Sequence, residues 1–467
     1  MFSAVARSAS KVLGQSERTP IPITVDASAP PLPKMQQRYA WDYLCYVLLP
    51  VTFLGFIGAF TVGKKTIVTP SLLVVGASTV VVALFALRHW SQLKNFPLLW
   101  PMAGYLAAVI LSGIHSISHL HWLRGVLETG VSFCFVVYPY FFLRNRQQLL
   151  RGIHVLIALG VLTVSFVFLQ TFWFNEMPRF MRVLYRVQDI WWISSWTAGG
   201  RVVGNWIHPG FLSSLLDLMA PLPLLFYFQE KRPRRFVWLG VFSYLAGCLL
   251  LANTRTSAIA LAISVALFGY LMRNWRKTVL ALLCALAMGV VLPQVAHRYG
   301  KPVYISAKEF GDADILERFE LFDIRNLRTI EMRRITQRVA LELFKGHPLF
   351  GIGMRNYPDR AKMLDPMAAF SVHNIIVQHL TETGLLGLFA FTILIIAAMR
   401  SDFQRSRWDS GDLQSIRYAL LASSVAVLLE SLAKNSLYVW QVAATFWLIR
   451  GMALTISARP KDFVSGK

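Results

Sequence analysis

The sequence predicts an all-α integral membrane protein with about twelve transmembrane helices. Of its 467 residues, 55% are hydrophobic and 13% are aromatic, and the mean hydropathy of +0.50 lies above the range of soluble domains. About twelve stretches reach the ~20 mostly apolar residues that a membrane-spanning helix needs. Transmembrane β-strands are short and alternate between apolar and polar residues, so these continuous stretches favour a helical bundle.

The predicted helices divide the chain into five regions. Residues 1–40 form a polar, proline-containing tail, and residues 41–295 contain nine helices. A long polar segment at 296–383 separates them from three further helices within 384–457, and residues 458–467 form a second tail. The centres of the predicted helices fall near Phe53, Ala77, Ala108, Phe133, Val161, Leu218, Phe242, Ile263, Leu286, Leu394, Val425 and Thr445.

The distribution of Lys and Arg predicts that both termini lie in the cytoplasm. With that orientation, the short cytoplasmic loops contain sixteen Lys and Arg residues between Arg88 and Arg417, and the short outside loops contain five: Lys64, Lys65, Arg124, Arg255 and Lys434. Lys and Arg in short loops set the orientation of a membrane protein, so this bias of about three to one is informative. The formal net charge of +23 lies in loops and at helix ends rather than on one soluble face, which argues against nucleic-acid binding.

The first long outside segment is an aromatic and basic loop near 175–209. It contains Trp191, Trp192, Trp196 and Trp206, and tryptophan favours the interface between membrane and water. Arg201 and His208 lie near its end, just before the next predicted helix. We expect part of this loop to lie on the outer surface of the membrane.

The second outside segment, 296–383, contains a predicted amphipathic helix. Apolar residues recur at intervals of three to five positions, which is typical of a helix with one buried face: Leu327, Ile330, Ile335, Val339 and Leu343. Gly346 and Pro348 are expected to end this helix. Its more polar side carries Arg333 and Arg334, so we expect the helix to lie on the bundle and present arginines to a cavity.

Ionisable residues of the predicted helices converge on the outside end of the bundle. Asp217, Arg255, Glu382, Glu430 and Lys434 all fall at or near that end. Charged groups at membrane depth are expensive and usually face an interior or a cavity. Structural counter-ions remain an alternative for Asp217 and Glu430, although independent pairs would be scattered over both sides. The convergence therefore predicts one polar cavity that opens to the outside.

His373 is the best candidate for proton transfer. It lies where the polar segment returns to apolar sequence, followed by Asn374 and Glu382. An imidazole with its ordinary pKa of about 6.5 exchanges protons readily near neutral pH. A structural role for a histidine at a helix start remains an alternative.

The sequence predicts neither a metal site nor a bound cofactor. It contains no Walker A, GxSxG or HExxH motif. Asp312 and Asp314 have the DxD spacing that metal-dependent transferases often use, but acidic pairs are also common in solvated loops. The outside basic residues are arginines more than lysines, and the guanidinium fork suits bidentate binding of phosphate oxygens.

Four segments together resemble the O-antigen ligase and polymerase superfamily of bacterial inner membranes, and within it the lipopolysaccharide O-antigen ligases. They are RVVGNWIHPG (201–210), NTRTS (253–257), RRITQRVALELFKGHPLFGIG (333–353) and HNIIVQHLTETGLLG (373–387). In the family an arginine precedes an aromatic residue by four positions. Gln337 replaces that aromatic here, so Arg333 and Arg334 both remain candidates for the equivalent arginine.

The resemblance implies a GT-C-like glycosyltransferase of the Gram-negative inner membrane, with a long periplasmic loop containing amphipathic helices. It implies transfer of O-antigen from undecaprenyl diphosphate to a sugar hydroxyl of lipid A-core at the periplasmic face, without nucleotide or metal. In that reaction His373 would be the general base. The residues that would bind the diphosphate are Arg201, Arg255 and Arg333 or Arg334. The supporting residues would be His208, together with Asn374 and Glu382, which would orient the imidazole or the acceptor.

Other functions remain open at this stage. An O-antigen polymerase uses the same donor with a different acceptor, and a protein O-oligosaccharyltransferase of the same superfamily transfers to Ser or Thr. A polytopic transporter is the alternative from a different class. Transporters often show repeat halves with midplane charges, and neither feature is evident in this sequence.

Overall fold

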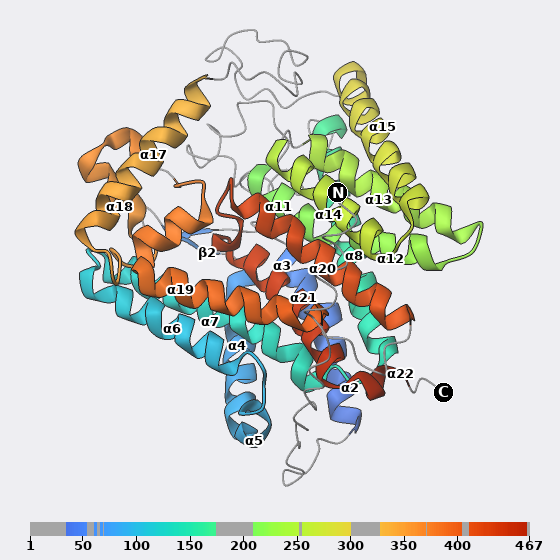
Figure 1. Ribbon diagram of the computed structural model, residues 1–467, viewed down its shortest axis with the longest axis horizontal. Coiled ribbons are helices and arrows are strands. Elements are labelled where there is room, and N and C mark those ends of the chain that lie inside the picture. Colours follow the sequence, from blue (N-terminus) through green and yellow to red (C-terminus); the bar gives the residue numbers. More distant parts are fainter. Residues whose placement is uncertain are drawn as a thin grey trace, which may run out of the picture.

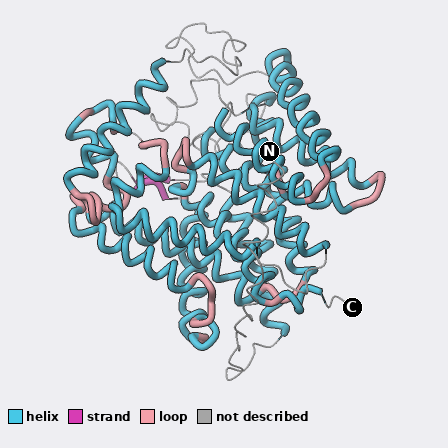
Figure 2. The backbone as a smooth tube through the Cα atoms, viewed as in Figure 1, coloured by secondary structure: helices cyan, strands magenta, loops and turns pink. Residues whose placement is uncertain are grey.

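In the computed structural model, the described chain is helical except for one short hairpin (Figure 2). The structure describes residues 34–53, 60–62, 66–68, 70–173, 209–251, 255–299, 327–369, 371–403 and 411–464. In the hairpin, β1 (Phe60–Val62) pairs antiparallel with β2 (Thr66–Val68). The predicted helical class is therefore confirmed, while the hairpin was not predicted.

The helices before the polar segment follow the predicted order of apolar stretches. They are α2 (Lys34–Tyr43), the π-helix η1 (Leu44–Leu48), α3 (Leu49–Phe53), α4 (Pro70–Arg88), α5 (Trp90–Leu93), α6 (Leu99–Leu111), the 3₁₀ turn η2 (Ser112–His115), α7 (His119–Phe142), α8 (Arg146–Trp173), α11 (Pro209–Met219), α12 (Leu222–Gln229), α13 (Arg234–Leu251), α14 (Arg255–Leu271) and α15 (Trp275–Tyr299).

The remaining helices begin inside the polar segment. They are α17 (Leu327–Gly346), α18 (Tyr357–Leu364), the 3₁₀ turn η6 (Pro366–Ala368), α19 (Ile375–Phe403), α20 (Gly411–Ser431), the 3₁₀ turn η7 (Ser436–Tyr438), α21 (Trp440–Ala458) and α22 (Pro460–Val464). Each predicted helix centre lies within a helix, from Phe53 in α3 to Thr445 in α21. The predicted amphipathic helix is α17, which ends at Gly346.

Six of the described helices are long and apolar enough to cross a membrane. They are His119–Phe142, Arg146–Ser165, Gly210–Gln229, Trp275–Leu292, Ile375–Phe403 and Gly411–Ser431. Three shorter apolar helices are Leu73–Arg88, Leu99–His115 and Arg255–Leu271. These helices indicate a multi-pass membrane protein. The count of twelve spans and the placement of both termini in the cytoplasm stay predictions.

The candidate spans differ in how much of their surface other helices cover. In Gly210–Gln229, 94% of the apolar window is buried, whereas in Trp275–Leu292 only 22% is buried. On α15 the exposed side chains include Leu283, Leu286 and Val291. A contiguous apolar surface of this kind is unusual on a soluble monomer and suits contact with lipid.

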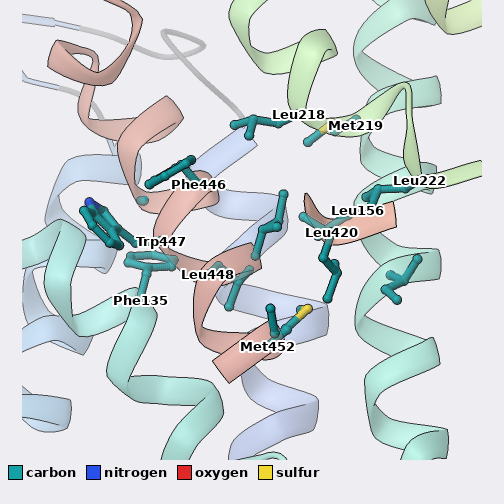
Figure 3. Packing of buried hydrophobic residues seen from close by; sticks show 14 of the residues in the cluster. Phe135, Leu156, Leu218, Met219, Leu222, Leu420, Phe446, Trp447, Leu448 and Met452 are labelled. Atoms are coloured by element: carbon teal, nitrogen blue, oxygen red, sulfur yellow. The ribbon is translucent and has the colours of Figure 1, made fainter. Parts of the chain in front are cut away.

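The core of the bundle centres on α21, in which every residue from Trp440 to Ile456 is buried. A helix that is apolar on all sides belongs in the interior, surrounded by other helices. Figure 3 shows Phe446 and Met452 of α21 among Phe135 of α7, Leu156 of α8 and Leu420 of α20. This packing fixes the start of α21, and with it the preceding turn η7.

A polar layer made of α17 and α18 lies at one end of the bundle, against α19 (Figure 1). Val339, Ala340, Tyr357, Ala361 and Val372 form a small second core beneath this layer. We call this end of the bundle, with α17, α18, the start of α19 and η7, the site end. The end of α19 and helix α22 lie at the opposite end.

Candidate active site

The turn that follows α17 supplies hydrogen-bond partners at a point where the helical geometry of α19 is interrupted. At Gly384 the backbone leaves helical geometry, with φ 67° and ψ −169°, so nearby backbone groups need other partners. The turn supplies four hydrogen bonds. The amides of Ile352 and Gly353 donate to the carbonyls of Thr381 and Glu382 (both 3.0 Å), and the amides of Leu385 and Leu386 donate to the carbonyls of Pro348 (2.9 Å) and Leu349 (3.2 Å). The HPLFGIG and ETG sequences therefore form one junction.

Two glycines allow the turn and α19 to approach this closely. A Cβ on Gly351 would lie 2.4 Å from the carbonyl carbon of Glu382, and a Cβ on Gly384 would lie 2.3 Å from the carbonyl oxygen of Leu349. Both glycines have positive φ values, 72° and 67°, which glycine adopts with little strain. A side chain at either position would push the turn away from α19.

Glu382 anchors the same junction from inside α19. Its carboxylate is fully buried and accepts hydrogen bonds from the backbone amides of Arg355 (2.9 Å) and Tyr357 (3.2 Å). These contacts direct the Glu382 carboxylate to the start of α18. A role of Glu382 in orienting the imidazole or the acceptor stays a prediction.

Arg355, which the sequence analysis did not select, joins three parts of the site end. Its guanidinium donates to the carboxylate of Glu128 on α7 and to the backbone carbonyl of Tyr438 in η7. Burial lowers the pKa of Arg355, but the Glu128 and Glu382 carboxylates outweigh it, so the pKa lies above its ordinary value. The available signal was its place in the GIGMRNY run, directly after the two glycines of the turn.

The loop that carries His373 is held by Asn435, just before η7. The Asn435 side-chain amide donates to the hydroxyl of Ser371 (2.8 Å) and to the side-chain carbonyl of Gln378 (2.6 Å). On the other side of His373, the Asn374 side chain accepts from the amides of Ile376 (2.9 Å) and Val377 (3.1 Å). Asn374 therefore caps the N-terminus of α19 and fixes the chain direction next to the histidine.

The surroundings of His373 are buried and positively charged. Burial, with Arg333 and Lys434 nearby, lowers the pKa of His373 from 6.5 to about 4. Its backbone has φ 57°, in the left-handed region that is sparsely populated by residues other than glycine and recurs at functional sites. The imidazole is therefore neutral at pH 7, as a general base requires.

Arg333 and Arg334 are adjacent on α17 but differ in their exposure to solvent. Arg333 is half-buried, and burial lowers the pKa of its guanidinium, whereas Arg334 is exposed. The helix is fixed in this rotation by the Tyr357 hydroxyl, which donates to the carbonyl of Thr336 at 2.7 Å. Arg333 is thus the arginine of the pair that acts on His373.

Lys434 connects the His373 region to α11 and α14. Its ammonium donates to Glu430 (2.6 Å), to the hydroxyl of Ser213 on α11 (3.0 Å) and to the hydroxyl of Ser257 on α14 (3.0 Å). Ser257 also donates to the fully buried Glu430 carboxylate. Because Ser257 is two residues from Arg255, this network sets the N-terminal turn of α14 beside Lys434.

Some of the predicted residues cannot be placed. Arg201, His208, Asp312 and Asp314 lie outside the described residues, as does nearly all of the 175–209 loop. Within the part of the chain that the structure describes, no group of three or more His, Cys, Asp or Glu side chains could hold a metal ion. Of the predicted site residues, the structure brings Arg333 close enough to His373 to affect its charge. Lys434 also affects the charge of His373, although it was not among the predicted site residues.

Comparison with known families gives one match. Residues 240–392 match a family model described as O-antigen ligase. The matched segment contains Arg255, Arg333, the turn that completes α19 and His373. No curated protein matches the chain.

Proposed function

We propose that this membrane protein transfers O-antigen polysaccharide from undecaprenyl diphosphate to a sugar hydroxyl of lipid A-core, and the match of residues 240–392 to an O-antigen ligase family model supports this proposal. The observation that carries the proposal is a neutral, half-buried His373 beside the cations of Arg333 and Lys434. A general base next to fixed positive charge suits attack by a hydroxyl with departure of an anion.

In the proposed reaction, His373 takes the proton from the acceptor hydroxyl. The oxygen forms a bond to the anomeric carbon of the donor, and the bond from that carbon to the diphosphate oxygen breaks. The diphosphate leaves with the electron pair and stays attached to the lipid. A single displacement of this kind inverts the configuration at the anomeric carbon.

The arginines stabilise the charge that develops on the leaving diphosphate. Arg333 lies at the His373 side and Arg255 begins α14. Arg201 is proposed as a third ligand on the strength of its motif alone. Fixed guanidinium groups bind phosphate oxygens in pairs and cost no reorganisation during the reaction, so they serve in place of a divalent cation.

Donor binding should make His373 a stronger base. In the free protein, burial and the positive charges of Arg333 and Lys434 lower the pKa of His373. The diphosphate dianion would partly cancel the effect of those two charges. The pKa of His373 then rises toward its ordinary value, nearer the working pH. His373 is thus unprotonated in the free protein and becomes more basic once the donor has bound.

Asn374 and Glu382 act as positioning residues in this proposal. Asn374 fixes the start of α19 next to His373, and Glu382 holds the turn that completes α19. The site end would face the periplasm of a Gram-negative bacterium, with both termini in the cytoplasm and the chain in the inner membrane.

The test is transfer in vitro with the full-length protein in detergent. Undecaprenyl-diphosphate-linked O-antigen and lipid A-core are supplied in the presence of EDTA, and wild type is compared with His373→Ala. Wild type should yield slower-migrating lipopolysaccharide, and loss of the base should lower the rate by about 10²–10⁴-fold. Chain growth on the lipid donor without transfer to lipid A-core would identify a polymerase. Transfer only to Ser or Thr of a peptide would identify a protein O-oligosaccharyltransferase, and no glycosyl transfer at all would favour a transporter.

A further inference from the structure

A second group of basic side chains lies at the site end, where α18 and the turn after α17 meet η2. Nη2 of Arg360 on α18 donates to the backbone carbonyl of His115 in η2 at 2.9 Å. His347 is the first residue after α17, and its imidazole lies against that of His115, with ring centroids 4.4 Å apart. We call His115, His347 and Arg360 the basic cluster.

The polar groups of the basic cluster are only partly used within the protein. Nε of Arg360, Nδ1 of His115 and Oγ of the adjacent Ser116 are buried and have no hydrogen-bond partner in the described part of the chain. Among the described residues, Arg360 pairs with no carboxylate, because the neighbouring Asp359 pairs with His121 at 2.7 Å. Polar groups without partners are costly once they are withdrawn from water, so a bound hydrogen-bond acceptor would stabilise the cluster.

The basic cluster is positively charged and reachable from outside. Each of its three residues is half-buried rather than buried. Burial and the neighbouring His115 and Arg360 lower the pKa of His347, so its surroundings disfavour a further positive charge. A guanidinium beside two imidazoles therefore repels a metal cation, whereas guanidinium and imidazole N–H groups bind phosphate oxygens well.

The connection between two apolar helices places the basic cluster at the surface of the membrane. His115 ends the apolar helix Leu99–His115, and the candidate membrane-spanning helix His119–Phe142 begins four residues later. A short connection between two such helices lies where the apolar interior of a membrane meets the headgroups. The side chain of Asn356, just before α18, accepts from the amide of Ser118 at 2.8 Å, so the start of α18 is held at the same level.

Exposed apolar side chains accompany the basic cluster in each of the segments that form it. They are Ile114 and Ile117 beside His115, Leu349 shortly after His347, and Met363 and Leu364 after Arg360. Residues three and four positions apart on a helix share a face, so the last two lie beside Arg360 on α18. A basic group bordered by exposed apolar side chains matches a lipid, in which a phosphate is joined to acyl chains. A free anion needs no apolar border.

The basic cluster is separate from the proposed diphosphate site. His347 follows Arg333 by fourteen residues, which is about 20 Å along the axis of α17. One diphosphate cannot contact both positions, so a phosphate at the basic cluster belongs to another molecule.

We propose that the basic cluster binds the phosphate group of an anionic phospholipid in the membrane leaflet at the site end. Arg360 and the two imidazoles would bind the phosphate oxygens, and the exposed apolar side chains would contact the acyl chains. Because the three residues come from η2, the turn after α17 and α18, the bound lipid would link the layer made of α17 and α18 to the bundle.

The test uses the full-length protein in neutral detergent, with phosphatidylglycerol as the probe lipid. The rise in the unfolding midpoint on addition of phosphatidylglycerol is compared with the rise on addition of phosphatidylcholine, which is zwitterionic, and of inorganic phosphate. Phosphatidylglycerol should stabilise the wild type most. An equal rise with phosphatidylcholine would show that the anionic headgroup is not recognised, and an equal rise with inorganic phosphate would show that the lipid part is not. Either result would overturn the proposal.

Variants locate the bound lipid, and native mass spectrometry gives its dissociation constant. Arg360→Gln removes the guanidinium and should weaken phosphatidylglycerol binding by about tenfold to hundredfold, whereas His347→Gln should weaken it by about twofold to tenfold. Lys362→Gln is the matched control. Lys362 is exposed on α18, and two residues along a helix correspond to about 200° around its axis, so Lys362 lies on the opposite side from Arg360. The control should bind phosphatidylglycerol like the wild type.

The unfolding midpoint without added lipid shows separately whether a substitution harms the fold. If Arg360→Gln is destabilised without lipid, the comparison rests on His347→Gln and on Arg360→Lys, which keeps the charge and should retain part of the binding. Wild-type affinity in a stable variant of the cluster, or equal weakening in Lys362→Gln, would overturn the proposal. The measurement involves no glycosyl transfer, so its outcome is independent of the proposed function.

Discussion

The two ends of the bundle use buried ion pairs in different ways. At the opposite end, Arg450 of α21 pairs with Asp402 of α19 at 2.7 Å, and both side chains are fully buried. At the site end, Lys434 pairs with Glu430 at 2.6 Å, but the lysine side chain is 15% exposed while the glutamate is fully buried. Arg450 also donates to the Ser424 hydroxyl at 3.2 Å, so the partners of its guanidinium lie inside the bundle.

The difference indicates that the Arg450–Asp402 pair stabilises the bundle, whereas the charge of Lys434 can affect neighbouring groups. Arg450 and Asp402 neutralise each other away from solvent, and removal of either leaves an unpaired charge at high cost. Lys434 keeps part of its surface free and acts on His373. We therefore expect variants of the ion pair at the opposite end to change stability, and variants of the cations at the site end to change rate and pH dependence.

The largest effect on stability is expected from Arg450→Met. The change leaves the Asp402 carboxylate buried without its partner, which should cost about 3–5 kcal/mol of unfolding free energy. Thermal unfolding in detergent measures it. The double variant Arg450→Met with Asp402→Leu should recover most of the loss, because no charge is then left buried. Transfer per folded molecule should match wild type, and a selective loss of rate would contradict the division between the two ends.

Arg333→Ala should give the largest rate effect among the arginines of α17. Removal of one charge-stabilising donor typically costs about 10²–10³-fold in rate, and Arg333→Lys should recover only part of it because an ammonium lacks the guanidinium fork. Arg338→Ala is the matched control, since Arg338 is exposed on the same helix. If Arg334→Ala lowered the transfer rate more than Arg333→Ala, then Arg334 rather than Arg333 would be the arginine that acts at the site.

The pH profile tests Lys434. A change of Lys434→Met paired with Glu430→Gln removes the cation without leaving a buried carboxylate unpaired. With less positive charge near it, protonation of His373 costs less, so its pKa rises from about 4 toward its ordinary value. Activity is lost as the base becomes protonated, so the acid limb of kcat/KM should move to higher pH. At pH below both limbs, a shift of one pH unit would change the neutral fraction about tenfold.

Lys434→Arg is the control for that profile because it keeps the charge, and its acid limb should stay in place. In wild type, the acid limb of kcat should lie at higher pH than that of kcat/KM for the donor, because kcat reports the complex in which diphosphate is bound. Coincident limbs would argue against a donor-linked change in the basicity of His373.

The smallest effect is expected from Asn374→Ala. Loss of an N-cap side chain costs about 0.5–2 kcal/mol, here at the start of α19. Asn374→Asp and Asn374→Ser keep an oxygen acceptor and should restore the unfolding midpoint measured by circular dichroism. If both replacements unfold as easily as Asn374→Ala, the side chain acts through something other than the cap.

The sequence predicted the elements well because helices depend on local patterns. Long apolar stretches located helices at every predicted centre, and periodic apolar residues located α17 with its end at Gly346. The histidine and arginines of the site could be proposed from their chemistry and their motifs. The hairpin of β1 and β2 was missed because its strands are three residues each, too short for an alternating pattern to be evident.

Contacts between distant segments could not be predicted in the same way. Arg355 bonds to Tyr438, 83 positions away, and to Glu128, 227 positions away, and no local pattern encodes such pairs. The partners of Glu382 were equally unpredictable: its carboxylate accepts from the amides of Arg355 and Tyr357 at the start of α18, because the break at Gly384 brings the turn against α19.

By itself, the sequence determined a helical membrane protein whose residues 240–392 match an O-antigen ligase family model, with His373 at the start of a helix and arginines close by. Only the tertiary structure decided that Arg333 rather than Arg334 acts on the charge of His373, and that Lys434 joins them. Neighbouring residues of a helix point about 100° apart. The packing of α17 on α19, rather than the order of the residues, therefore selects the arginine that reaches the site.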